Sequence, residues 1–80
     1  MTVYEIRFKP ADDAAPQDTT IRAADDVGAR QMAFLVIREH LAGELRDRGQ
    51  IDLRGSAHII DTEGSEIFAI DFAHAVGVVR

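Results

Sequence analysis

The 80-residue sequence contains no cysteine and no tryptophan, and it has only two prolines. Without cysteine the chain can form no disulfide, no thiolate nucleophile and no cysteine-ligated zinc or iron–sulfur site. The N-terminus also lacks a long apolar run. Residues 1–7 alternate and carry charge early, unlike the apolar segment of a signal peptide or a membrane span. We therefore predict a soluble, cytoplasmic protein with no membrane partner.

Basic side chains are scarce as well. Nine Lys and Arg residues stand against 14 Asp and Glu residues, which gives a net charge of -5. An acidic excess repels the phosphate backbone that a nucleic-acid-binding protein must attract. The five basic residues in segment 27–54 alternate with four acidic ones, a pattern typical of a solvated helix face. We expect no nucleic-acid partner.

What is present fits one small globular domain over residues 1–80. Hydrophobic residues make up 46% and charged residues 29% of the chain, which is the ordinary range for folded proteins. A chain of this length buries only about two-thirds of its unfolded surface. We therefore expect one modest core and little material to shape a deep cleft.

The N-terminal third has the pattern of β-structure. Residues 1–9 alternate with a period of two and include aromatic and β-branched residues, which predicts a half-buried strand that ends at Pro10. The segment 10–18 is polar and contains proline, so it predicts a loop. Residues Thr19–Ala23 have strand propensity and predict a second strand beside the first.

A helix is predicted over Asp26–Arg48. Asp25 is a suitable N-cap and Asp26 adds negative charge to the first turn, while Gly49 marks the C-terminal stop. Two more strands are expected over 56–61 and 66–72, joined by a hairpin loop in which Gly64 supplies a positive φ.

These elements predict an α+β fold in which an antiparallel three- to four-stranded sheet packs on one long helix, in the order ββαββ or βαββ. The tail, residues 73–80, has strand character but is interrupted by Gly77. We interpret it as a frayed end or as an edge that docks on another chain.

The helix carries more apolar residues than one sheet can cover. When the helix residues are projected at about 100° per residue, six apolar residues fall in one arc, which we predict to face the core. They are Val27, Ala33, Phe34, Ile37, Leu41 and Leu45. Leu35 lies about 80° beyond this arc, and Met32 and Val36 point nearly opposite it. We predict that Met32, Leu35 and Val36 form a subunit or partner interface in a homodimer, the commonest symmetric assembly. Scattered surface apolar residues are the alternative explanation.

The histidines titrate near neutral pH and can bind metals, but their spacing matches no metal-binding pattern. We interpret each as a structural residue at the surface or partly buried; they are His40, His58 and His74.

Paired carboxylates can perform acid–base chemistry when one is desolvated, but each group here has a structural explanation. Asp12 and Asp13 lie in the predicted loop, and Asp25 and Asp26 lie at the predicted helix start. The hairpin accounts for Asp61, Glu63 and Glu66. The hairpin is not a calcium loop, since Gly64 falls at the fourth place and Phe72 at the twelfth. The serines lack the glycines of a nucleophile elbow, and we see no histidine–carboxylate pair near them in sequence. We therefore predict a non-enzymatic protein with no catalytic residue, cofactor or metal.

The order of elements resembles a family of small alphaproteobacterial proteins that is classified only as a domain of unknown function. The similarity is carried by the aromatic strand with Tyr4, Ile6 and Phe8, by the long Ala/Arg-rich helix, and by the hairpin Asp61-Thr62-Glu63-Gly64. The family has no assigned activity, so the resemblance implies a bacterial origin and no site residues.

The leading functional hypothesis is a small protein-interaction module that self-associates and presents a surface to a protein partner. The alternative is a small-ligand binder or minor enzyme whose pocket forms between subunits. An acidic mimic of nucleic acid is a third, weaker reading, because the negative charge is modest and divided between the two ends of the chain.

Overall fold

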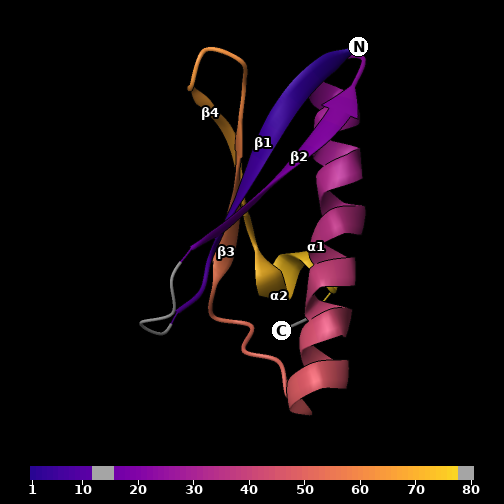
Figure 1. The fold of residues 1–80 in the computed structure, drawn as a ribbon, viewed down its shortest axis with the longest axis vertical. Helices are drawn as coiled ribbons and strands as arrows, with labels where there is room; N and C mark the ends of the chain where they lie inside the picture. Colours follow the sequence, from indigo (N-terminus) through magenta and orange to yellow (C-terminus); the bar gives the residue numbers. More distant parts are fainter. Residues whose placement is uncertain (12–15, 78–80) are drawn as a thin grey trace.

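The alternating N-terminal pattern and the long helical segment fold into a four-stranded antiparallel sheet with one helix across one of its faces (Figure 1). The computed structural model describes residues 1–11 and 16–77. The elements are β1 (Thr2–Lys9), β2 (Gln17–Ala23), α1 (Asp26–Arg48), β3 (Ser56–Ile60), β4 (Glu66–Asp71) and α2 (Phe72–Ala75). The predicted α+β class and the ββαββ order of the main elements are confirmed. Asp12 and Asp13 lie outside the described residues.

The strands lie in the order β2-β1-β3-β4, and every neighbouring pair is antiparallel. β2 begins at Gln17, two residues before the predicted start. The reason is pairing: β1 continues to Lys9, and its ladder extends β2 to the pair Phe8↔Gln17, although Gln17 and Asp18 are exposed polar residues. Local propensity does not report such tertiary pairing.

Both ends of α1 are set by the residues that predict them. The Gly28 N–H donates to Asp25 Oδ1 over 2.8 Å, and Gly49 adopts φ 74° while its N–H donates to the Leu45 carbonyl. The Tyr4 hydroxyl donates to Asp26 Oδ1 over 2.8 Å and ties the start of the helix to β1. This hydrogen bond to a carboxylate raises the pKa of Tyr4.

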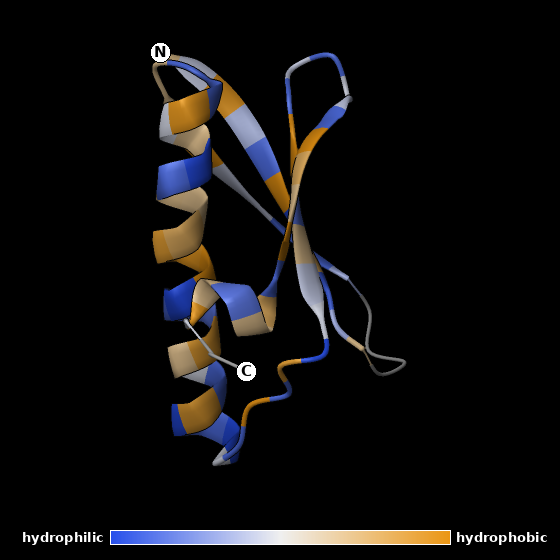
Figure 2. Cartoon of the chain, turned by 180° about the vertical axis from the view of Figure 1, so that it is seen from behind, coloured by the Kyte–Doolittle hydropathy of each residue, from blue (hydrophilic) through white to orange (hydrophobic). Residues whose placement is uncertain are grey.

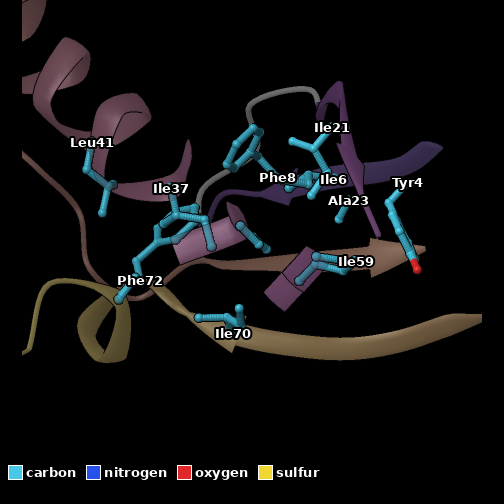
Figure 3. Packing of buried hydrophobic residues seen from close by; sticks show 14 residues of the cluster. Tyr4, Ile6, Phe8, Ile21, Ala23, Ile37, Leu41, Ile59, Ile70 and Phe72 are labelled. Atoms are coloured by element: carbon cyan, nitrogen blue, oxygen red, sulfur yellow. The ribbon is translucent and has the colours of Figure 1, made fainter. Parts of the chain in front are cut away.

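The core lies between the sheet and one face of α1 (Figure 3). The buried helix residues follow a spacing of four: Ala29, Ala33, Ile37 and Leu41. The predicted core arc is therefore only partly right, since Phe34 is half-buried and Val27 and Leu45 are exposed. The small side chains of Ala29 and Ala33 face the large residues of the sheet, and the helix is turned so that they, not Val27, make the close contact.

The C-terminal segment departs from the prediction. β4 ends at Asp71, and Phe72 begins the short helix α2 instead of completing the strand. The Phe72 N–H donates to the Gly55 carbonyl over 3.0 Å. Phe72 and Ala75 are both buried, and their spacing of three suits a helical turn that brings both against the core. The expected strand character is thus wrong for 73–75, and residues 78–80 lie outside the described part of the chain.

The hairpin between β3 and β4 forms as predicted. The Asp61 N–H donates to the Ser65 carbonyl over 2.9 Å, and Gly64 has φ 85°. In the described part of the chain, neither helix has the length and hydrophobicity needed to cross a bilayer.

Candidate functional site

Two of the three predicted interface residues lie on the surface of α1. Met32 is 41% exposed and Leu35 is 57% exposed. Val36 is half-buried and packs against the core, so the expectation that it points away from the sheet is wrong. The cause is the rotation of α1 described above, which turns Val36 toward the sheet and leaves Leu35 opposite the buried line of residues.

Leu35 is the centre of a surface that we call the outer face of α1. It is formed by residues that follow one another at alternating steps of four and three: Gly28, Met32, Leu35, Glu39, Ala42 and Arg46. This spacing keeps side chains on one side of a helix over several turns. Figure 2 shows apolar stretches along α1 that face away from the sheet as well as toward it.

A cavity of about 170 Å³ lies beside the second half of α1. Its lining includes residues of α1 and of the segment 49–55, and Figure 1 shows that this part of the helix extends past the end of the sheet. Phe8, Leu41 and Phe72 line its apolar part, and the His40 ring stacks on Phe8 with the ring centres 4.2 Å apart. The remaining lining is Pro10, Ala11, Gln17, Glu44, Arg48, Gln50 and Asp52.

The charged groups of the cavity lining are paired. Arg48 Nε lies 3.2 Å from Glu44 Oε2, one helical turn away. Asp52 accepts hydrogen bonds from the Arg54 side chain and backbone, and these lower the pKa of Asp52 to about 2. The cavity therefore combines an aromatic wall with the carboxylates of Glu44 and Asp52.

A second polar constellation lies on the face of the sheet that α1 leaves uncovered. The Ser56 Oγ is 3.0 Å from His58 Nε2, and His58 Nδ1 is bonded to the Glu66 carboxylate. The His58 side chain is only 17% exposed. Ser56 and His58 come from β3, and Glu66 comes from the start of β4.

This serine–histidine–carboxylate contact corrects the expectation that the serines lack such partners. The spacing of Ser56 and His58 places both side chains on one face of a strand. The hairpin then returns Glu66 beside them, eight residues after His58 in sequence. Alternation over the two strands of the hairpin is the signal that could have predicted the contact, but the sequence explains Glu66 only as a residue that frames the hairpin.

Arg7 lies on the same face of the sheet, directly opposite His58 in the pairing of β1 with β3. Its guanidinium donates to Glu5 Oε1 over 3.0 Å and to Asp18 Oδ1 over 3.3 Å. The hydrogen bond to Glu5 and the charge of Asp18 raise the pKa of Arg7. These contacts make the uncovered face a charged surface that joins β2, β1 and β3.

The three histidines have different surroundings. His40 is half-buried in the cavity wall, His58 is held on the uncovered sheet face, and His74 is exposed with its ring 5.6 Å from that of Phe34. Across residues 1–11 and 16–77, no three or more His, Asp or Glu side chains gather in a way that could hold a metal ion.

Comparison of the chain with protein-family models, curated protein sequences and solved structures finds no match. The resemblance to the alphaproteobacterial family of unknown function therefore stays a prediction.

Proposed function

We propose that the protein is an interaction module that self-associates through the outer face of α1, with a second copy of the chain as its partner. The observation that carries this proposal is the exposure of Met32 and Leu35 in the middle of that face. Full burial of such a side chain contributes about 1.5–3 kcal/mol. This is a large increment for an 80-residue chain, since small domains are stable by only about 5 kcal/mol.

The residues around Leu35 favour an antiparallel pair of helices. Gly28 and Ala42 lie seven residues before and after Leu35, so a two-fold axis at Leu35 places these small residues opposite each other and lets the helices approach. A parallel pair would instead set Glu39 against its own copy. Like charges in such a position are unfavourable.

The charges at the ends of α1 also favour an antiparallel pair of helices. The helix begins beside Asp25 and Asp26 and ends with Arg46 and Arg48. Antiparallel packing sets the acidic start of one copy beside the basic end of the other, and it also opposes the two helix dipoles.

Sedimentation equilibrium at micromolar concentration tests this proposal. We expect a dimer for the wild type and a folded monomer for Leu35→Glu, because the dimer would bury the new carboxylate without a partner. The matched control is Val3→Glu, which introduces the same group at a residue 43% exposed on the uncovered sheet face, beside Arg22. It should remain a dimer. A monomeric wild type, or equal dissociation of both variants, would contradict the proposal.

The cavity supports a second function, the binding of a small ring compound within one chain and not between subunits. Its volume of about 170 Å³ exceeds that of an engineered cavity of about 150 Å³ that binds benzene. Phe8 and Phe72 offer aromatic edges and faces to such a ring.

Thermal unfolding in the presence of phenol or indole tests this second function. A ligand that binds the folded state raises the melting temperature with concentration, and the amide resonances of Phe8, His40 and Phe72 should shift with it. A melting temperature independent of both compounds would count against a ring-binding cavity.

A further inference from the structure

We propose that Ser56 is a nucleophile that accepts an acyl group from small activated esters, with His58 as its general base and Glu66 as the residue that positions the histidine. This activity is separate from self-association, because the residues lie on the uncovered sheet face and not on the outer face of α1.

The order of atoms carries the proposal. Glu66 is bonded to Nδ1 of His58, which fixes the proton on that nitrogen. Nε2 is then an acceptor, and it lies 3.0 Å from the Ser56 Oγ. A serine becomes nucleophilic when a base within hydrogen-bond reach is itself oriented by a third group, on whatever fold the three occur.

The sheet also places a cation beside the nucleophile. Lys9 is the cross-strand partner of Ser56 in β1, and it is exposed. Within the described residues, its ammonium makes no ion pair. A positive charge at this position can stabilise the negative oxygen that develops during acyl transfer.

The basic group opposite His58 is already held by carboxylates, and the acidic neighbour of Ser56 lies on the side away from Lys9. Arg7 faces His58 and is bonded to Glu5 and Asp18, and Asp71 is the partner of Ser56 in β4. Lys9 is therefore the cation that we assign to the developing oxyanion.

The proposed reaction transfers an acyl group from the ester to Ser56. His58 Nε2 takes the proton from Ser56 Oγ as the new bond forms between Oγ and the carbonyl carbon. The bond from that carbon to the leaving oxygen then breaks, and His58 returns the proton to this oxygen. The products are an ester of Ser56 and the free alcohol. Water attacking the Ser56 ester by the same route releases the acid and restores the hydroxyl.

The size of the acyl group follows from the location. The cavity lies on the helix side of the sheet, because residues of α1 and the buried Phe8 line it. Ser56 and His58 alternate with the core-facing residues Ala57 and Ile59 and so lie on the opposite side. This cavity cannot hold an acyl donor at Ser56, so the donor must react because its own leaving group is good. This favours small activated esters.

Acylation by p-nitrophenyl acetate, followed by mass spectrometry of the intact protein and of its peptides, tests the proposal. We expect one acetyl group on Ser56 in the wild type and none at this position in Ser56→Ala. His58→Gln should slow acylation by about 100-fold or more, the usual contribution of a general base. The matched control is Ser65→Ala in the exposed hairpin, which should react as the wild type does.

Glu66→Gln separates a positioning role from a structural one. The variant should slow acylation of Ser56, because an amide oxygen is a weaker acceptor than a carboxylate for the proton on His58 Nδ1, and Glu66→Asp should restore part of the rate. Circular dichroism would verify that each variant is folded. An acetyl group found only on Lys9 or on a histidine, or an unchanged rate in His58→Gln, would overturn the proposal. Neither result would alter the dimer test above.

Discussion

The two faces of α1 are both apolar in their middle turns, yet only one is buried. The inner face presents Ala29, Ala33 and Ile37 to the sheet, and none of them is accessible to solvent. The outer face presents Met32 and Leu35, which are both exposed. The sheet thus packs on the face that combines two alanines with Ile37, and Met32 and Leu35 are left outside. Hydrophobicity alone does not tell which side of such a helix is the core.

The largest difference between the faces should follow from truncating one residue on each. Ile37→Ala should lower the free energy of unfolding by about 2–5 kcal/mol, because it leaves a cavity in the core. Leu35→Ala should change the stability of the monomer by about 0.5 kcal/mol or less. Urea unfolding at concentrations that keep the chain monomeric measures both. Similar losses would show that the outer face is covered within one chain.

Two glycines provide a second comparison. A Cβ at Gly55 would lie 2.6 Å from Phe72 Cε2 and 2.8 Å from the Lys9 carbonyl oxygen, whereas one at Gly43 on α1 meets nothing nearer than Arg46 at 3.8 Å. Gly55→Ala should therefore destabilise by about 1–3 kcal/mol. Gly43→Ala should stabilise by about 0.5–1 kcal/mol, the usual gain of Ala over Gly inside a helix. Thermal unfolding of the two variants gives the signs, and a tolerated Gly55→Ala would contradict the close packing of Phe72 against Gly55.

A smaller loss is expected at the start of α1. Asp25→Ala removes the acceptor for the Gly28 N–H and should lower stability by about 1 kcal/mol. Asp47→Ala, near the other end of the helix, is the control and should have less effect. Denaturant unfolding distinguishes the two, and equal effects would argue against a capping role.

The smallest effect concerns a surface ion pair. Arg54 lowers the pKa of Asp52 to about 2, below its ordinary value of 3.8. A carboxyl whose pKa is lower in the folded state stabilises the fold at pH values above its ordinary pKa. This contribution is lost as the pH falls through the pKa of the folded state. The loss should occur between about pH 4 and pH 2. Carboxyl NMR titration of Arg54→Ala should show the pKa of Asp52 return toward 3.8; an unchanged value would exclude Arg54 as the cause.

Much of the fold could be predicted because its signals are local. Asp25 and Gly49 set the helix ends, Gly64 sets the hairpin, and the alternation of residues 1–9 predicts β1. Each depends on backbone chemistry within a few residues. These predictions are confirmed at or near the expected positions.

The remaining features depend on contacts between distant segments. The rotation of α1 that exposes Val27 and buries half of Val36 is set by packing on the sheet, which the helical projection does not contain. Phe72 lies in α2 because its side chain is buried there and its N–H donates a hydrogen bond to the Gly55 carbonyl. The contact of Glu66 with His58 requires the register of the hairpin. Such tertiary effects override local propensity.

Cross-linking at a single thiol tests the self-association most directly. The chain has no cysteine, so Leu35→Cys carries one thiol at the proposed two-fold axis, and Thr20→Cys carries one at an exposed site on the uncovered sheet face. With a short thiol-specific cross-linker, the account predicts a covalent dimer for Leu35→Cys and a monomer for Thr20→Cys. A Leu35→Cys protein that stays monomeric, or equal cross-linking of both variants, would contradict it.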